Sequence, residues 1–294
     1  MILITGGTGV MGRALIKGLN KNIRVLTLPD DPNARAVTDA DIIYGDVSES
    51  DTIQGCCENV ETVYHLAAVI ISFNDEIYTQ VNLEGTRNVV NEAVKAGVQH
   101  FIYISSASVV YPKTTAYSRS KRQAEKIVRE SGLNYTIVRP TLVYDYEGSV
   151  EFDIFLDYLR LFPVVPFIGS GRAIKRPVFV EDVIAGLISL HGNPVSYGKT
   201  YNLSGGEEIS IIDFARLCLE LMGLKNRPIV SIPVWLCMLL SKAMGFLMKR
   251  PPLRWPVIAG ITQDANLLPD LAREELEYRP VKVSVKLPEC FPRK

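Results

Sequence analysis

The sequence has few of the residues that build metal sites or disulfide frameworks. Among 294 residues there are five cysteines and three histidines. Because the number of cysteines is odd and two of them are adjacent, neither a set of disulfides nor a structural zinc site is expected. The cysteines show no C-x-x-C spacing: they are Cys56, Cys57, Cys218, Cys237 and Cys290. We expect buried thiols in a reducing compartment and no bound metal.

The chain also lacks an excess of charge of one sign. Its 32 basic and 32 acidic residues cancel. A neutral chain has no broad attraction for polyphosphate backbones, so nucleic acid is not an expected partner. Apolar residues make up 47% and charged residues 22%, which is typical of a globular protein and excludes disordered and fibrous classes. The sequence contains no internal repeat and no low-complexity segment.

Long apolar runs and an export signal are missing as well. No basic region with an apolar core and a cleavage site precedes Met1, so we expect a cytoplasmic location. The most apolar stretch, residues 229–248, is interrupted at Pro233 and Lys242 and falls short of the roughly 18–20 apolar residues that a spanning helix needs. We expect a buried or pocket-lining helix there, with a membrane-surface anchor as the alternative, and no spanning segment.

The first 140 residues alternate short β-type apolar runs with helical stretches. Such alternation predicts parallel β-α-β units with both faces of the sheet covered. The fold class is therefore α/β, a Rossmann-type doubly wound parallel sheet with a smaller C-terminal domain. Expected strands are 2–5, 23–28, 42–44, 62–66, 101–104 and 135–138, and expected helices are 10–20, 50–57, 83–96 and 115–130.

After Pro140 the alternation gives way to a stretch rich in aromatics and proline. We place the domain boundary there. Residues 1–140 form the first domain, and residues 141–294 mainly form a substrate-binding domain. A segment of about 175–203, which contains a strand running into a helix, is expected to return to the first domain.

A glycine-rich segment, TGGTGVMG at 5–12, lies between the first strand and the first helix. Its spacing fits both G-x-G-x-x-G and G-x-x-G-x-x-G. Glycine permits a sharp turn and lets backbone N–H groups approach a pyrophosphate at the positive end of the helix. The alternative is a tight turn without a ligand. The positions expected to contact a dinucleotide are Gly6, Gly9, Val10, Met11 and Gly12, which makes the first domain NAD(P)-binding.

An acid that binds the ribose is expected at the end of the second strand. Asp30, with Asp31 beside it, falls just past that strand. Carboxylates accept hydrogen bonds from ribose hydroxyls and repel a 2′-phosphate, so they favour NAD. NADP remains an alternative because Arg24 and Arg35 are near in sequence. Asp46, after the third strand, could accept from the adenine amino group or could simply be a turn residue.

A tyrosine and a lysine four residues apart, Tyr117 and Lys121, lie at the start of the helix expected at 115–130. Another Y-x-x-x-K, at 278–282, contains Pro280 and cannot be helical. A phenol has an unperturbed pKa near 10, and an ammonium one turn away, together with a nicotinamide ring, lowers it. Tyr117 could then take the proton of a substrate hydroxyl while hydride passes to the nicotinamide.

With these pieces in place, the chain resembles the extended short-chain dehydrogenase/reductase superfamily, that is, the NAD-dependent epimerase/dehydratase family together with 3β-hydroxysteroid dehydrogenases and dihydroflavonol reductases. The resemblance spans nearly the whole length. It is carried by TGGTGVMG (5–12), GDV (45–47), YHLAA (64–68), VNLEGTRNVVNEA (81–93), YISSASVVY (103–111), YSRSK (117–121), VRPTLVY (138–144), PVFVEDV (177–183) and AREELEYRP (272–280).

The resemblance implies roles for particular residues. Tyr117 would be the catalytic acid/base and Lys121 would hold the cofactor ribose. Ser106 aligns best as the catalytic serine, with Ser105 and Ser108 as rivals. Asn82 would support the backbone of the site, and no role is assigned to His65. Further positions expected to line the cofactor are Val47, Leu66, Ala67, Ala68 and Pro140. The family's dimers would pack the helices at 83–96 and 115–130 into a four-helix bundle, so a homodimer is expected.

The sequence departs from the family pattern at the substrate side. Only ten residues separate Ser106 from Tyr117, and Leu142 stands where nucleotide-sugar enzymes commonly carry asparagine. The first departure shortens a wall of the pocket. The second favours a small or apolar substrate, as does the apolar stretch at 229–248. Arg172 and Arg176, with Ser108 as a further contact, could instead hold a nucleotide diphosphate, or could lie in a solvated turn.

Three functions therefore stay open. The leading one is reversible, NAD(P)-dependent hydride transfer at a secondary alcohol or ketone carbon of a small molecule, using Ser106, Tyr117 and Lys121. A nucleotide-sugar epimerase or dehydratase would oxidise its substrate transiently with bound NAD. A non-catalytic dinucleotide-binding scaffold or sensor, resembling accessory subunits of respiratory complex I, belongs to another class.

Overall fold

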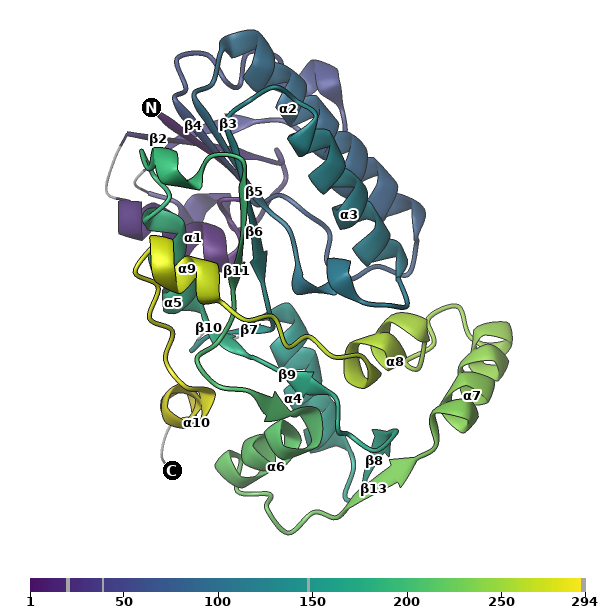
Figure 1. Ribbon diagram of the computed structural model, residues 1–294. Coiled ribbons are helices and arrows are strands. Elements are labelled where there is room, and N and C mark those ends of the chain that lie inside the picture. The colour runs from purple at the N-terminus through teal and green to yellow at the C-terminus, as the bar shows by residue number, and fades with distance from the viewer. Residues whose placement is uncertain (20–21, 39, 147–148, 292–294) are drawn as a thin grey trace.

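The computed structural model describes residues 1–19, 22–38, 40–146 and 149–291. Within these residues, seven parallel strands form the main sheet in the order β11-β6-β5-β4-β1-β2-β3. The strands are β1 (Ile2–Thr5), β2 (Ile23–Thr27), β3 (Asp41–Tyr44), β4 (Thr62–His65), β5 (His100–Ile104), β6 (Tyr135–Pro140) and β11 (Lys199–Leu203). Helices lie on both faces (Figure 1), so the predicted α/β Rossmann-type fold is confirmed.

Two helix pairs cover the sheet. On one face, α1 (Val10–Leu19) packs against α5 (Val180–Ile188), and on the other α2 (Gly85–Ala96) packs against α3 (Ala116–Arg129). Central strands such as β1 and β5 are buried along their whole length, which explains their continuous apolar sequences. Residues 180–203 thus supply α5, which packs on this sheet, and its edge strand β11.

Several element ends follow from local chemistry. Thr115 caps α3, with its hydroxyl accepting from the Ser118 backbone N–H at 3.0 Å, and α2 ends at Gly97 with φ +68. The expected helix at 50–57 is a 3₁₀ turn over Ser50–Ile53, and a π-helix over Tyr78–Glu84 precedes α2. The expected end of the first helix at Asn20 lies outside the described residues.

The strand order reverses beside β1. From β1 the chain moves to β2 and β3 on one side, whereas β4, β5, β6 and β11 lie on the other. The connections leaving β1 and β4 therefore diverge at the carboxyl ends of the strands. In doubly wound sheets this topological switch point is where a crevice forms and ligands bind.

The smaller region lies beyond the carboxyl ends of the strands (Figure 1). Three two-stranded sheets pair β7 (Val143–Tyr144) with β10 (Val178–Phe179), β8 (Val165–Ile168) with β13 (Ile229–Ile232), and β9 (Ile174–Lys175) with β12 (Ile209–Ser210). Its helices are α4 (Val150–Leu161), α6 (Ile211–Leu221), α7 (Val234–Leu247), α8 (Trp255–Thr262) and α10 (Val283–Lys286), whereas α9 (Asp270–Glu275) packs against β11 of the main sheet. Short 3₁₀ turns cover Ala34–Ala36, Ala107–Val110, Pro194–Ser196 and Leu287–Cys290.

The expectation of a buried or pocket-lining helix at 229–248 is wrong. Cys237 is the buried residue of α7, whereas Trp235 is 69%, Phe246 91% and Leu247 79% exposed. The helix stands at the edge of the molecule, at the end of the arm that contains β13 (Figure 1). Apolar composition predicts that a surface will be covered, but it does not say by what. Among the described residues, no helix is long and apolar enough to cross a membrane.

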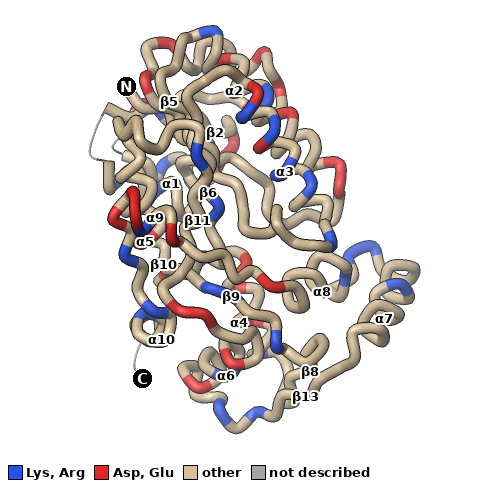
Figure 2. The backbone as a smooth tube through the Cα atoms, in the orientation of Figure 1, with Lys and Arg blue, Asp and Glu red and all other residues tan. Residues whose placement is uncertain are grey.

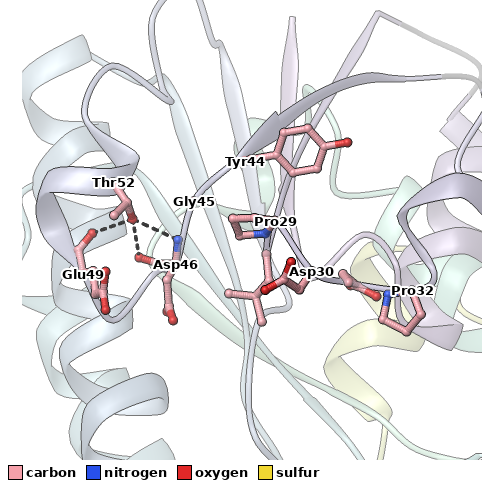
Figure 3. A pocket seen from close by; sticks show the side chains of 10 residues that line it. Pro29, Asp30, Pro32, Tyr44, Gly45, Asp46, Glu49 and Thr52 are labelled. Carbon is pink, nitrogen blue, oxygen red and sulfur yellow. Dashed lines mark hydrogen bonds between the residues drawn. The ribbon is translucent and has the colours of Figure 1, made fainter.

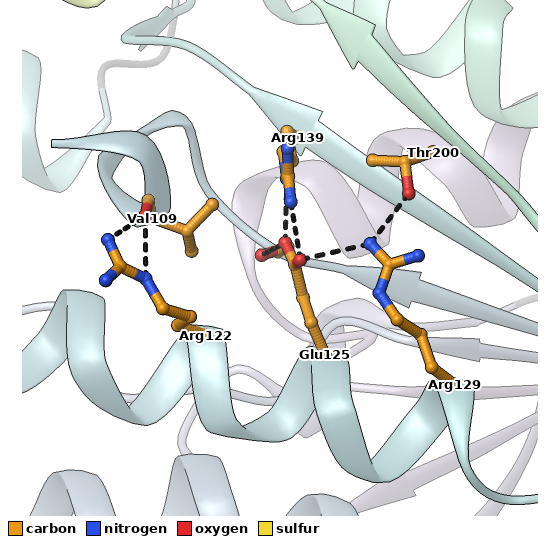
Figure 4. A network of polar contacts seen from close by, with 7 residues as sticks. Val109, Arg122, Glu125, Arg129, Arg139 and Thr200 are labelled. Atoms are coloured by element: carbon orange, nitrogen blue, oxygen red, sulfur yellow. Dashed lines mark hydrogen bonds and ion pairs between the residues drawn. The ribbon is translucent and has the colours of Figure 1, made fainter.

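A buried carboxylate joins α3 to the sheet (Figure 4). Glu125 accepts hydrogen bonds from Arg139 on β6, at 2.8 Å from Nε and 2.6 Å from Nη2, and from the Ser105 hydroxyl at 2.6 Å. Arg129 adds an ion pair at 3.4 Å. Burial raises the pKa of Glu125, but the hydrogen bonds from Arg139 and Ser105 outweigh it and hold that pKa below its usual value.

We expect Glu125→Gln to lower the free energy of unfolding by about 3 kcal/mol, because Arg139 loses its buried charged partner. The folded-state pKa of Glu125 lies below the unfolded value of 4.5. Its contribution is therefore complete above pH 4.5 and is lost as the pH falls through the lower folded value. Urea unfolding from pH 7 to 3 should show a steeper acid loss for the wild type than for the variant. Glu130→Gln, on the exposed end of the same helix, should change stability by less than about 0.5 kcal/mol; equal effects would contradict the assignment.

We expect Gly12→Ala to lower the free energy of unfolding by roughly 2 kcal/mol, because a Cβ at this position would overlap the Gly6 carbonyl oxygen. Gly245 is also helical, but a Cβ there meets nothing within 4 Å. Gly245→Ala should therefore raise stability by about 0.5–1 kcal/mol. Denaturant titrations of both variants measure the contrast, and destabilisation of equal size would refute the packing role of Gly12.

Candidate active site

The glycine-rich loop lies at the switch point and leaves no room for side chains. Gly6 has φ +72, and a Cβ on it would lie 2.7 Å from the backbone nitrogen of Ala67. The Gly9 backbone N–H donates to the Gly6 carbonyl at 3.3 Å, and α1 begins at Val10 with Met11 next. The loop thus presents the N-terminal turn of α1, with its positive end, at a surface free of side chains. This geometry fits a pyrophosphate.

A cavity of about 800 Å³ lies beyond the ends of β2 and β3 (Figure 3). It lies next to the glycine-rich loop, because Asp31 in its lining hydrogen-bonds to Thr8 of that loop. Both predicted acids, Asp30 and Asp46, line it. Its other lining residues are Leu28, Pro29, Asp31, Pro32, Tyr44, Gly45, Glu49 and Thr52.

The two adjacent aspartates do different work in this cavity. Asp31 accepts hydrogen bonds from the hydroxyls of Thr8 at 2.6 Å and Thr27 at 3.0 Å, and from the Asn33 backbone N–H at 2.9 Å. Burial raises the pKa of Asp31, but these three hydrogen bonds outweigh burial and lower the pKa below its usual value. Asp31 therefore ties the segment after β2 to the glycine-rich loop and fixes the position of Asp30 on the cavity wall.

Asp46 is fixed within its own turn. Its carboxylate accepts from the backbone N–H and the hydroxyl of Ser48, at 2.8 and 2.7 Å. Its backbone N–H donates to the Thr52 hydroxyl at 2.9 Å (Figure 3). Val47, the next residue, is buried against Gly85 at the start of α2. The turn after β3 is thus a rigid part of the wall.

The segment after β4 forms a wall beside the glycine-rich loop, against Gly6. Leu66, Ala67 and Ala68 are half-buried, and the Ala67 backbone N–H donates to the Thr5 hydroxyl at 3.2 Å. Asn82 is fully buried and holds the next residue, Val69, by two hydrogen bonds of 2.8 and 2.9 Å. The backbone beside the glycine-rich loop is therefore held on both sides.

His65, to which the sequence assigned no role, is a buried link beneath this wall. Its ring nitrogens lie 2.6 Å from the Thr5 hydroxyl and 2.9 Å from the Thr86 hydroxyl. Burial, and then the nearby Lys121 ammonium, lowers the pKa of His65 to about 3. The ring is neutral at physiological pH, which suits a fixed hydrogen-bond bridge.

Tyr117 and Lys121 lie one turn apart on α3. Lys121 is 2% exposed, and its ammonium donates to the Ile104 carbonyl at 2.6 Å. It also lies 4.5 Å from the centre of the Tyr103 ring. Burial lowers the pKa of Lys121 to about 7, although the nearby Glu125 carboxylate raises it in part.

The structure distinguishes the three neighbouring serines. Ser105 is buried and its hydroxyl donates to Glu125, away from Tyr117. Ser106 accepts from the Ser108 backbone N–H at 3.2 Å, and the hydroxyls of Ser106 and Ser108 lie 3.0 Å apart. The Ser106 hydroxyl is the hydrogen-bonding partner that lowers the pKa of Tyr117. Ser106 therefore lies beside the phenol, with Ser108 next to it.

Two side chains near Tyr117 were not anticipated from the sequence. The Tyr78 ring packs edge-on at 5.9 Å, and Glu151 occupies the first turn of α4. Burial raises the pKa of Tyr117 above its usual range, and the negative charge of Glu151 raises it further. An acid in the first turn of a helix is common for other reasons, so the sequence carried no signal of this proximity.

The two arginines predicted to contact substrate differ in their exposure to solvent. Arg176 is held inside the protein, 2.5 Å from Asn266 Oδ1 and 3.0 Å from Glu208 Oε2, whereas Arg172 is exposed. Lys175 is buried and donates to the Gln263 carbonyl, and burial lowers its pKa to about 8. Arg176 thus lies in an internal polar network, which removes the observation that favoured it as a free diphosphate clamp.

The C-terminal region braces the short connection that precedes Tyr117. Gln263 donates to the Lys113 carbonyl at 2.8 Å and accepts from the Lys113 backbone N–H at 2.7 Å. The Trp255 indole N–H donates to the Thr114 carbonyl at 2.9 Å. The α8 segment therefore forms part of the site wall. Pro140, at the end of β6, is buried.

Comparison with known proteins agrees with this architecture. The chain is 26% identical to UDP-glucose 4-epimerase of Vibrio cholerae, over 83% of this chain and 82% of that one. It is 24% identical to a 3-beta-hydroxysteroid dehydrogenase of Mycolicibacterium neoaurum, over 99% and 90% of the two chains. A crystal structure of dTDP-glucose 4,6-dehydratase from Streptomyces venezuelae superposes with a TM-score of 0.79, at 19% identity, over 99% of this chain and 95% of that one.

The family model of the NAD-dependent epimerases and dehydratases matches residues 2–204. This range contains the glycine-rich loop, the cavity after β2 and β3, and the start of α3. The chain therefore belongs to the NAD-dependent epimerase/dehydratase family, which is a family of enzymes.

Proposed function

We propose that this chain is an NAD-dependent oxidoreductase that transfers hydride at a secondary alcohol or ketone carbon of a small molecule. The observation that carries the proposal is the placement of Tyr117 beside Ser106, with the Lys121 ammonium buried one turn further along α3. A scaffold without turnover has no need of a buried ammonium, which is costly to maintain.

The residues at the switch point suit NAD. Gly6, Gly9 and Gly12, with Val10 and Met11, would receive the pyrophosphate on backbone N–H groups. Asp30 would accept from the ribose hydroxyls, and Asp46 from the adenine amino group. Val47, Leu66, Ala67, Ala68 and Pro140 would line the remainder. Bound NAD supplies the hydride acceptor and a positively charged nicotinamide ring. Because Asp30 and Asp31 both repel a 2′-phosphate, the site favours NAD over NADP.

Tyr117 would act as the acid/base. Burial and Glu151 keep its phenol protonated at neutral pH, so it must be ionised by nearby positive charge before it can accept a proton. Lys121, whose own pKa is about 7, would supply that charge and hold the cofactor ribose. In oxidation, the substrate hydroxyl gives its proton to Tyr117 Oη as the carbinol carbon loses hydride. Ser106 would hold the same substrate oxygen.

The substrate side favours a small or apolar alcohol. Leu142 offers no polar contact, and Arg176 is held by Glu208 and Asn266. Ser108 would add one hydroxyl to the pocket. A nucleotide-sugar epimerase or dehydratase is the second candidate, because Arg172 is exposed in the substrate half and the V. cholerae epimerase aligns over most of the chain. We also propose a cytoplasmic homodimer that packs α2 and α3 of two copies together.

We expect Tyr117→Phe to lower kcat/KM by about 10²–10⁴-fold, because the proton of the substrate hydroxyl loses its acceptor. The dissociation constant of NAD should change by less than about twofold, since the phenol oxygen contributes little to ground-state cofactor binding. NADH formation with a panel of secondary alcohols and NAD titration by fluorescence provide the measurements. Tyr197→Phe, whose ring packs on His100 at the amino-terminal end of β5, should keep full activity.

The same assays separate the competing functions. Turnover without net NADH formation, with cofactor retained through purification, would transfer the assignment to an epimerase or dehydratase. Unchanged activity in Tyr117→Phe would refute the acid/base assignment. Mass spectrometry of molecules released on denaturation would identify a retained dinucleotide or nucleotide sugar.

We expect the two adjacent aspartates to respond differently to replacement. Asp30→Ala should weaken NAD binding by about tenfold while leaving the thermal midpoint unchanged, because one ribose acceptor is lost from an exposed position. Asp31→Ala should lower the free energy of unfolding by about 1–2 kcal/mol, since the hydroxyls of Thr8 and Thr27 and the N–H of Asn33 lose their acceptor. Calorimetric titration and thermal unfolding of both variants measure this, and a reversed pattern would exchange the two roles.

A further inference from the structure

One face of α7 is apolar and exposed. Trp235, Leu239, Leu240, Phe246 and Leu247, which we call the α7 face, are each at least 42% exposed. At about 100° of rotation per residue, the five positions fall within an arc of about 140°, so they lie on one side of the helix. Cys237, on the opposite side, packs in a small cluster with Ile168 and Ile258. The helix therefore packs against the protein through one side and exposes the other side to solvent.

The segment that contains α7 is basic. Residues 221–263 contain no acidic residue and six basic ones, although the whole chain is neutral. The basic residues are Lys225, Arg227, Lys242, Lys249, Arg250 and Arg254. Outside this segment the chain has 26 basic and 32 acidic residues. Lys242 lies on α7, and Lys249, Arg250 and Arg254 lie in the connection to α8. Figure 2 shows acidic residues concentrated elsewhere.

A second apolar segment adjoins the basic connection. Phe73, in the loop after β4, is about half exposed, and Ile70 and Ile71 beside it are also exposed. The guanidinium of Arg254 lies 4.2 Å from the Phe73 ring centre and that of Arg250 lies 5.9 Å from it. Apolar side chains and guanidinium groups thus share one surface, which extends toward the site through the Trp255–Thr114 hydrogen bond.

We propose that the α7 face docks into the surface of a membrane that carries anionic lipids. An in-plane helix with an apolar face and basic residues at its border inserts that face at the level of the headgroups, while the cations attract anionic lipid. Trp235 is suited to this interface, because tryptophan prefers the boundary between headgroups and acyl chains. The acidic excess of the rest of the chain is repelled by the same surface, so α7 is presented first.

A second copy of the chain fits this surface less well. Two α7 faces in contact would bring two acid-free basic segments together, and like charges facing each other oppose association. A lipid surface instead supplies the missing negative charge. The docking proposal is independent of the reaction proposed above, since it needs neither cofactor nor turnover.

Vesicle sedimentation tests the proposal with the 294-residue chain. We expect binding to vesicles of phosphatidylcholine with about one-third phosphatidylglycerol, and at least fivefold weaker binding to phosphatidylcholine alone. Phe246→Asp/Leu247→Asp should reduce binding to the mixed vesicles by at least about tenfold, because charged groups do not enter the apolar layer. Lys249→Glu/Arg250→Glu should abolish the preference for anionic lipid.

Matched variants control for non-specific effects. Val195→Asp places a charge at another exposed apolar position, and Arg279→Glu/Lys282→Glu makes the same change in net charge on a different surface. Both should bind as the wild type does. Wild-type protein that stays in the supernatant with both vesicles, or controls that lose binding as much as the α7 variants, would overturn the proposal. The proposal would also be overturned if sedimentation velocity showed that the wild type is a dimer that does not bind vesicles and that the α7 variants dissociate this dimer.

Fluorescence gives a second measurement that needs no change on the α7 face. Trp235 and Trp255 are the only tryptophans of the sequence. In Trp255→Phe, emission comes from Trp235 alone. We expect a blue shift on addition of the mixed vesicles and quenching by brominated acyl chains. Unchanged emission with sedimenting protein would show that another surface binds lipid, and would overturn the assignment to α7.

Discussion

The candidate site depends on two opposite charges buried on one face of a single helix. Lys121 and Glu125 are one turn apart on α3, and both point at the sheet. An isolated buried charge is strongly unfavourable, so each needs partners at fixed positions. The ends of β5 and β6 provide them: the Ile104 carbonyl for Lys121, and Arg139 for Glu125. This pairing sets the distance and rotation of α3, and therefore the position of Tyr117.

The fold followed from the sequence because its information is local and periodic. Apolar runs of strand length, separated by helical stretches, gave the sheet, and the glycine spacing after the first strand located the switch point. The helix expected at 115–130 matches α3, which the Thr115 hydroxyl caps. None of these inferences required knowledge of which distant side chains meet.

The site was predicted less completely, for the opposite reason. Ser105 and Ser106 are adjacent, and only the structure shows that the first faces Glu125 while the second lies beside Tyr117. Glu125 looks like any helical surface acid until Arg139 is placed opposite it. Arg176 appeared free in sequence but is held by residues far along the chain. The α7 prediction failed because hydropathy measures a tendency to leave water and carries no information about the neighbouring surface.

The hydrogen bonds between Lys113 and Gln263 join segments 150 residues apart, and Gln263 lies outside the range that the family model matches. The glycine-rich loop and the seven strands of the main sheet thus lie within the matched range, whereas the segment leading into the helix of Tyr117 is held by the C-terminal region. Changes in the tail can therefore reshape the entrance while the cofactor half stays as it is. A single scaffold of this design can diversify its substrates through its last hundred or so residues.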